Sequence, residues 1–170
     1  MTETHPFGNF VPKNSKYLIL GSFTGKITDP SYDWFYSNKR NQFWPILRQV
    51  YNLKLETKEE KQQLYKKLQI AITDIILSCD RKKGTNSDTN LTNITFNTKA
   101  IKKILNDNKI EKIFFSSKFV EKLFKKKFPD FTSLYPYSYF YTLPSPSPRY
   151  AKLSLSDKIK KYKKLLPTIA

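Results

Sequence analysis

The sequence predicts an α/β fold, a three-layer α/β/α sandwich around a four-stranded, mostly parallel sheet. Two observations lead to this prediction. Short runs of β-branched and aromatic residues alternate with longer segments in which apolar residues repeat at helical spacing. Residues 70–77, IAITDIIL, are apolar almost throughout, which is typical of a parallel strand buried on both faces. Parallel strands need right-handed crossover connections, so helices are expected on both faces of the sheet.

The first half of the chain supplies two of the expected strands. One covers residues 17–21 and ends at Gly21, where small residues leave room for a ligand against bare backbone. An amphipathic helix is expected over residues 41–52, and the capping-box pair Thr57 and Glu60 starts another. Residues 70–77 form the second strand. The polar residues 80–93, which include Gly84, are expected to form an exposed loop.

The second half repeats this alternation. A helix is expected from Asn97, a third strand over residues 111–116, and then a helix whose last turn carries three lysines. The fourth strand covers residues 138–143, and Ser154 begins a final helix. Residues 143–151, LPSPSPRYA, follow the fourth strand as Gly21 follows the first. Both stretches should therefore lie at the carboxyl edge of the sheet, where open α/β sheets bind their ligands.

Composition indicates a polyanionic partner. Lys and Arg total 31 against 14 Asp and Glu, a net charge of +17 over 170 residues. Nucleic acid is the leading partner on this ground, although a lysine-rich composition also arises from an AT-rich genome. The length is that of one domain, and we expect residues 1–170 to form a single domain.

Several kinds of chemistry are excluded by what the sequence contains. Cys79 is the one cysteine, so neither an intramolecular disulfide nor a thiolate metal cluster can form, and we expect no metal. His5 is the single histidine, so Ser-His or Cys-His chemistry requires this residue to fold back into the site. No signal-peptide pattern and no apolar run of membrane-spanning length is present, so we expect a cytoplasmic monomer without membrane contact.

Residues 34–44, WFYSNKRNQFW, place aromatic rings, amides and cations between a strand end and a helix. The Asn41 side chain can orient a water with its carbonyl and donate to a developing anion with its NH2 group. Alternatively, Asn41 caps the helix, for which asparagine is among the best residues. Tyr36 can stack on a nucleobase, whereas aromatic triplets also serve as core. Arg40 can contact phosphate.

The stretch LPSPSPRYA has three prolines that hold Ser145 and Ser147 in a stiff, extended loop beside Arg149. Small hydroxyls and backbone amides contact phosphates closely, and a preformed loop loses little entropy when it enters a duplex. The alternatives are a stiff connection between strand and helix, or a polyproline ligand for another domain.

Asp74 interrupts an apolar strand, and burying a lone carboxylate costs several kcal/mol. A functional interpretation makes it a reader of a base edge or an acid of the site. The alternative is a carboxylate at the strand's exposed end that pairs with Arg81 or with backbone amides of the following loop.

Five motifs, in order, resemble one known family. They are HPFGNFVPKNSKYLILGSF, FYSNKRNQFWPIL, ITDIILSCDR, SDTNL and LPSPSPRYA. The sequence resembles the bacterial and archaeal hypoxanthine (deoxyinosine) DNA glycosylases, a branch of the uracil-DNA glycosylase superfamily, over nearly its whole length. The resemblance implies a single domain with a four-stranded parallel sheet, monofunctional glycosylase action on a flipped base, and no cofactor.

The resemblance also implies roles for particular residues. Asn41 matches the asparagine that the family uses for catalysis, and Asp74 falls where superfamily members often place a base-reading side chain. Gly21, Ser22 and Phe23 match the family's first motif, and Ser145, Ser147 and Pro148 match its second. Together with Tyr36, Arg40 and Arg149, which we choose for their own chemistry, they give a base-binding set of Gly21, Ser22, Phe23, Tyr36 and Asp74 and a DNA-binding set of Arg40, Ser145, Ser147, Pro148 and Arg149.

We therefore expect a glycosylase that flips hypoxanthine or uracil out of DNA and hydrolyses its N-glycosidic bond in base excision repair. A second hypothesis, from a different class, is a non-catalytic nucleic-acid-binding module that retains the glycosylase fold.

Overall fold

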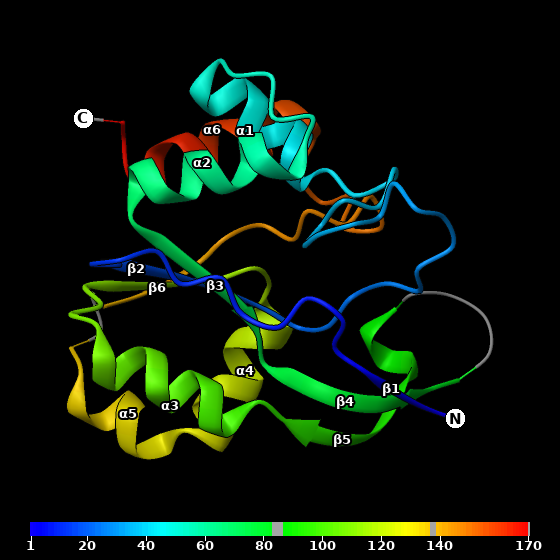
Figure 1. Ribbon diagram of the computed structural model, residues 1–170, viewed down its shortest axis with the longest axis vertical. Coiled ribbons are helices and arrows are strands. Elements are labelled where there is room, and N and C mark those ends of the chain that lie inside the picture. Colours follow the sequence, from blue (N-terminus) through cyan, green and yellow to red (C-terminus); the bar gives the residue numbers. More distant parts are fainter. Residues whose placement is uncertain (83–86, 137–138, 170) are drawn as a thin grey trace.

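The structure is a computed structural model that describes residues 1–82, 87–136 and 139–169. Within these ranges a central sheet separates two layers of helices, which Figure 1 shows above and below the strands. Gly84 of the expected loop and Ser138 of the expected fourth strand lie outside the described residues.

The main sheet contains four parallel strands in the order β3-β2-β6-β7. Their bounds are β2 Tyr17–Gly21, β3 Ile70–Asp74, β6 Lys112–Phe115 and β7 Phe140–Thr142. The register pairs Gly21 with Asp74, so both residues end their strands at the same edge. The predicted three-layer sandwich around a four-stranded parallel sheet is confirmed.

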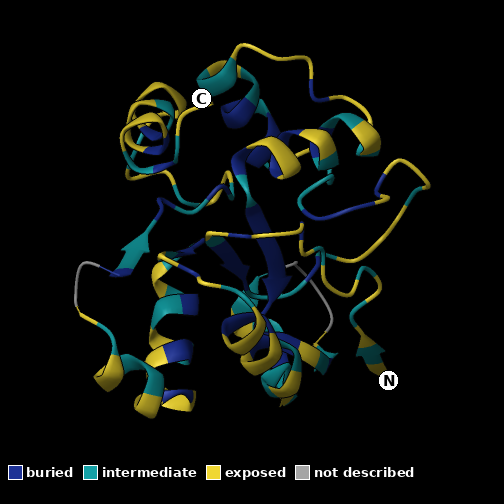
Figure 2. Cartoon of the chain, turned by 60° about the vertical axis from the view of Figure 1, so that its left-hand side comes forward, coloured by how far each residue is buried: buried dark blue, intermediate teal, exposed yellow. Residues whose placement is uncertain are grey.

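Alternation along β2 divides the core. Ile19 faces a cluster built with α1 (Phe43–Tyr51), α2 (Lys58–Leu68) and α6 (Leu155–Leu165). Leu18 and Leu20 face the opposite cluster, built with α3 (Thr98–Asp107) and α4 (Lys118–Lys127), beside the short, unpredicted α5 (Pro129–Leu134). Figure 2 shows the strands buried between helices whose outer faces are exposed.

A second, antiparallel sheet was not predicted, and it corrects two expectations. It contains β1 (Thr2–Thr4), β4 (Ile76–Arg81) and β5 (Leu91–Phe96), in the order β1-β4-β5. The run of residues 70–77 is therefore not one strand, because the chain leaves the main sheet at Ile75. Residues 80–93 are not simply a loop, since they hold the end of β4, the 3-10 helix η1 (Asp88–Asn90) and the start of β5.

The physical reason for the first error is that both parts of the run are buried in the core. The Ile75 N–H donates to Gly21 O at 2.8 Å, and Ile75 and Ile76 are fully buried. Hydropathy reports burial and does not report which sheet a strand joins. Strand β4 continues to Arg81, and Leu77 within it is 40% exposed.

Helix starts follow the predicted caps. The Thr57 hydroxyl accepts from Glu60 N–H and the Glu60 carboxylate accepts from Thr57 N–H, which completes the capping box. The Ser154 hydroxyl accepts from Asp157 N–H at the start of α6. No helix in the described part of the chain is long and apolar enough to cross a membrane. That residues 1–170 form a single domain stays a prediction.

Candidate active site

A cavity of about 980 Å³ lies at the carboxyl edge of the main sheet. It gathers segments from both halves of the chain, as the sequence predicted for this edge. Ten of the predicted site residues line it: Ser22, Phe23, Tyr36, Arg40, Asn41, Asp74, Ser145, Ser147, Pro148 and Arg149. The structure thus brings these residues together, and their functional roles stay predictions.

Gly21, the remaining predicted residue, lies directly behind the cavity wall. A Cβ atom at this position would lie 2.3 Å from Asp74 Oδ1 and 2.3 Å from the Tyr36 hydroxyl oxygen. Real Cβ atoms do not approach other atoms this closely, so only glycine fits without displacing one of these side chains. Gly21 therefore lets a carboxylate and a phenol converge on the end of β2.

Asn41 stands one residue before the N-cap of α1. Its Oδ1 accepts a hydrogen bond from Phe43 N–H at 2.9 Å, whereas the N-cap residue Gln42 makes no side-chain capping bond. The capping alternative is thus partly realised, since Asn41 satisfies an otherwise free helix N–H. The bond also orients the amide: within the described part of the chain its NH2 group has no hydrogen-bond partner, and the side chain lines the cavity.

The Ser-Pro loop, residues 144–149, is bonded directly to the segment that carries Asn41. Gln42 N–H donates to Pro146 O at 2.8 Å. The Lys158 ammonium, on α6, donates to Gln42 Oε1 at 2.7 Å and to Ser147 O at 3.1 Å. Lys158 is 1% exposed, and this burial lowers the pKa of its ammonium group. The loop is therefore locked against the start of α1 by a buried cation.

Hydroxyls inside the loop bond to its own backbone. Ser145 Oγ accepts from Ser147 N–H at 3.2 Å, and Ser147 Oγ accepts from Arg149 N–H at 3.3 Å. The Tyr162 hydroxyl donates to Pro144 O at 2.7 Å from below the loop. Pro148 and Arg149 remain exposed at its tip. The loop is thus preformed, with its tip available to a ligand.

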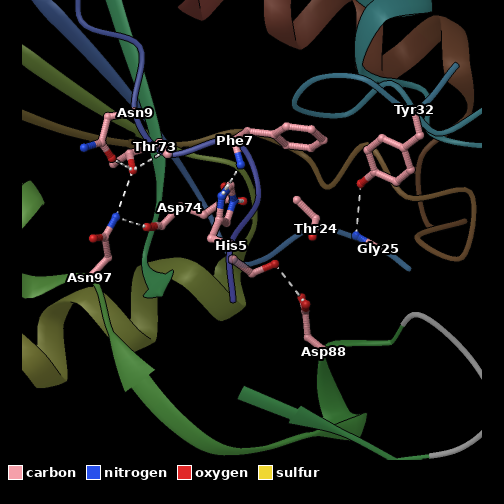
Figure 3. A network of polar contacts seen from close by, with 12 residues as sticks. His5, Phe7, Asn9, Thr24, Gly25, Tyr32, Thr73, Asp74, Asp88 and Asn97 are labelled. Carbon is pink, nitrogen blue, oxygen red and sulfur yellow. Dashed lines mark hydrogen bonds and ion pairs between the residues drawn. The ribbon is translucent and has the colours of Figure 1, made fainter. Parts of the chain in front are cut away.

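Asp74 pairs with His5, the single histidine, which therefore folds back into the site. The distance between His5 Nε2 and Asp74 Oδ2 is 2.6 Å, and the two side chains are 4% and 5% exposed (Figure 3). Phe7 N–H donates to His5 Nδ1 at 3.2 Å, so Nδ1 is unprotonated and the ring proton sits on Nε2. His5 is therefore a hydrogen-bond donor to Asp74 Oδ2.

The alternative expectation, that Asp74 pairs with Arg81, was wrong. Arg81 instead forms an ion pair with Glu3 at 2.9 Å and donates to Thr24 O at 2.8 Å. Arg81 belongs to β4, which has left the main sheet, and so its side chain reaches the amino-terminal strand β1. The Asn97 side-chain amide donates a hydrogen bond of 3.1 Å to the Asp74 backbone carbonyl, as Figure 3 shows.

Tyr36 holds an unusual conformation at the cavity wall. Its φ is 58°, a left-handed value that is uncommon outside glycine and asparagine. The ring stacks on Phe43 with centroids 4.2 Å apart, while the neighbouring Trp34 and Phe35 are core residues. Burial, followed by the charge of Asp74, raises the pKa of Tyr36 well above its ordinary value. The Ser116 hydroxyl moderates this pKa but does not reach hydrogen-bonding geometry, and the Tyr36 hydroxyl is buried with no partner among the described residues.

A second carboxylate in the cavity was missed. Ser22 Oγ donates to Asp88 Oδ1 at 2.9 Å, and burial raises the pKa of Asp88 despite this bond (Figure 3). Asp88 lies in the motif SDTNL, which carried part of the resemblance but no predicted role. Both His5 and Lys158 could have been found: His5 is the single histidine, and Lys158 lies three residues after Leu155 and four before Tyr162, on the inward face of its helix.

No group of three His, Cys, Asp or Glu residues that could hold a metal ion occurs among the residues that the structure describes. Cys79, on β4, is a free cysteine that is buried in the core. The arrangement thus offers an amide, two carboxylates, a phenol and a preformed loop around one cavity.

Comparison with known proteins extends this description. No protein-family model and no curated protein matches the sequence. Among solved structures, the chain is similar to a protein from Methanosarcina acetivorans, solved by solution NMR and proposed to be a uracil DNA glycosylase. The match has a TM-score of 0.70 at 20% identity and covers 97% of this chain and 96% of the other. The two chains therefore share a fold over nearly their whole lengths.

Proposed function

We propose that the protein is a monofunctional DNA glycosylase of the uracil-DNA glycosylase superfamily, of the hypoxanthine-directed kind, acting on a deaminated base, hypoxanthine or uracil, in DNA. The observation that carries this proposal is that Asn41 and Asp74 line one cavity beside the Ser-Pro loop. The fold shared with a proposed uracil DNA glycosylase and the net charge of +17 support the same function.

In this function the basic surface attracts DNA, and Arg40, Arg149 and the loop tip at Pro148 contact its backbone. The Ser-Pro loop is preformed, so it enters the duplex with little loss of entropy. A deaminated base opens at lower cost than an intact pair and rotates into the cavity. Phe23 and Tyr36 lie on the cavity wall and supply aromatic surface for the base.

Hydrolysis of the N-glycosidic bond proceeds through an oxocarbenium-like sugar, so the site must hold a water and stabilise the departing base. Asn41 holds the water, because its amide is fixed by the Phe43 N–H and lines the cavity. Asp74 and backbone amides read the edge of the base, and Gly21 and Ser22 border it.

A panel of duplexes, each containing a single hypoxanthine, uracil or other damaged base, tests the proposal. Strand cleavage by alkali after incubation reveals abasic product. We expect product from the hypoxanthine or uracil duplex with the wild-type protein, and none with Asn41→Ala at unchanged DNA affinity. Salt-sensitive binding without product from any lesion, even at protein excess, would favour the non-catalytic binding module instead.

A further inference from the structure

Two polar atoms beside Gly21 lack hydrogen-bond partners in the described part of the chain. They are Asp74 Oδ1 and the Tyr36 hydroxyl oxygen. Each lies 2.3 Å from the point where a Gly21 Cβ would stand, so the two atoms are at most twice this distance apart. Both residues line the cavity, and the missing glycine side chain leaves them facing the same space.

The two atoms have opposite hydrogen-bonding characters. His5 donates its Nε2 proton to Asp74 Oδ2, which leaves Oδ1 of the same carboxylate as an acceptor. Burial raises the pKa of Tyr36, so its hydroxyl keeps its proton and acts as a donor. An acceptor and a donor therefore stand side by side.

Folding alone does not explain why Tyr36 is placed in this way. Its backbone adopts a disfavoured positive φ of 58°, and its buried hydroxyl makes no hydrogen bond to the described residues. Buried polar groups are nearly always hydrogen-bonded, so an unpaired one points to a partner that arrives with a ligand. The stacked Phe43 ring holds the phenol in position for that partner.

We propose that Asp74 and Tyr36 are specificity-determining residues that together read the lactam edge, –NH–C(=O)–, of a flipped base. Asp74 Oδ1 accepts from the ring N–H, and the Tyr36 hydroxyl donates to the adjacent carbonyl oxygen. His5 is a positioning residue that holds the carboxylate. This inference rests on the proposed glycosylase function and names the residues that select its substrate.

The pair distinguishes a deaminated base from its parent because deamination exchanges the donor and acceptor positions on this edge. Hypoxanthine and uracil each present a ring N–H beside a carbonyl. Adenine and cytosine present an unprotonated ring nitrogen beside an amino group, which would set acceptor against acceptor and donor against donor. Both deaminated bases fit one reader, because the six-membered rings of hypoxanthine and uracil carry the same edge.

Duplexes with a 2′-fluoroarabino sugar, which resists hydrolysis, separate binding from turnover. Four are compared by fluorescence anisotropy: one each with hypoxanthine, 7-deazahypoxanthine, N1-methylhypoxanthine and adenine. We expect the first two to bind equally, since both keep the lactam edge. The last two should bind about 10- to 100-fold more weakly, because the hydrogen bond to the Asp74 carboxyl group is lost.

Variants of the full chain assign the effect to the named residues. Tyr36→Phe keeps the ring stacked on Phe43 and removes only the hydroxyl, so the preference for hypoxanthine over adenine should fall about tenfold without loss of thermal stability. His5→Ala should reduce the preference as well, whereas His5→Gln, which still offers a donor to Asp74, should restore part of it.

Equal binding of the N1-methyl and unmethylated bases, or a full preference in Tyr36→Phe, would overturn this inference. The binding assay needs no turnover, so the two proposals fail separately. Lesion-selective binding through this pair without abasic product contradicts the glycosylase function alone. Abasic product from a protein that ignores the N1-methyl group contradicts the edge-reading pair alone.

Discussion

On the side of the cavity that carries Asn41 and the Ser-Pro loop, polar groups bond to one another. There Lys158 donates to both Gln42 and the loop. On the side of Gly21, His5 fixes one oxygen of Asp74, while the other oxygen and the Tyr36 hydroxyl have no partner among the described residues. The comparison indicates that the first side is built to keep its geometry. The second side keeps two polar atoms available for the ligand that we propose.

The largest effect should come from the first side, at the catalytic candidate. Asn41→Ala should lower the single-turnover rate on a cleaved lesion about 100- to 1000-fold with little change in DNA affinity, because the water loses its holder. Asn41→Asp keeps an oxygen for the Phe43 N–H and for the water, so it should lose less. Equal losses in both variants would assign the role to the NH2 group.

On the second side, Gly21→Ala should be the most damaging change. The added Cβ must displace Asp74 Oδ1 or the Tyr36 hydroxyl, which should cost about 1–3 kcal/mol of unfolding free energy and remove the preference for a lactam edge. Thermal denaturation and the anisotropy assay measure the two effects. Gly8→Ala is the matched control: it is strained at φ 62° but meets no atom within 4 Å, so stability should fall while base preference stays. Loss of preference in both variants would contradict a local effect at Gly21.

Lys158→Met tests whether the first side depends on its buried cation. Gln42 Oε1 and Ser147 O would lose their donor, so we expect a loss of about 1–3 kcal/mol in unfolding free energy and a KM that rises more than kcat falls. Lys160→Met removes the same charge from an exposed position of α6 and controls for general attraction to DNA. Equal KM changes in the two variants would indicate that Lys158 acts only through its positive charge.

The smallest effect concerns pH and Asp88. Burial raises the pKa of Asp88 in the folded state above its unfolded value, so its ionisation opposes folding. Stability from this residue is present below the unfolded pKa and is lost as the pH rises through the folded pKa. Asp88→Asn should match the wild type in acid and unfold at a higher temperature at neutral pH. A variant that is less stable than the wild type at neutral pH would contradict this assignment.

The main sheet was predictable because β2, β3 and β6 are short apolar runs between amphipathic helices, and each is buried on both faces. The side sheet was not predictable in this way. Its strand β5, LTNITF, alternates apolar and polar residues but begins in a polar stretch that also has loop composition. Its partner β4 continues an apolar run without a break in hydropathy.

For the site, the two motifs at the carboxyl edge could be found because parallel topology places strand ends together. That His5 pairs with Asp74 did not follow from the sequence, because His5 is 69 positions away and only the tertiary fold shows that the closer cation Arg81 bonds Glu3. The burial of Lys158 was predictable from its place on the apolar face of α6, whereas its bonds to Gln42 and Ser147 depend on the tertiary fold.

The bonds that define the cavity join residues very distant along the chain. His5 and Asp74 are 69 positions apart, and Gln42 and Lys158 are 116 apart. Such closures come late in folding, because the entropy of long loops must be lost before they form. Under the proposed function, base removal requires a completely folded chain, because the cavity forms only when these distant segments meet.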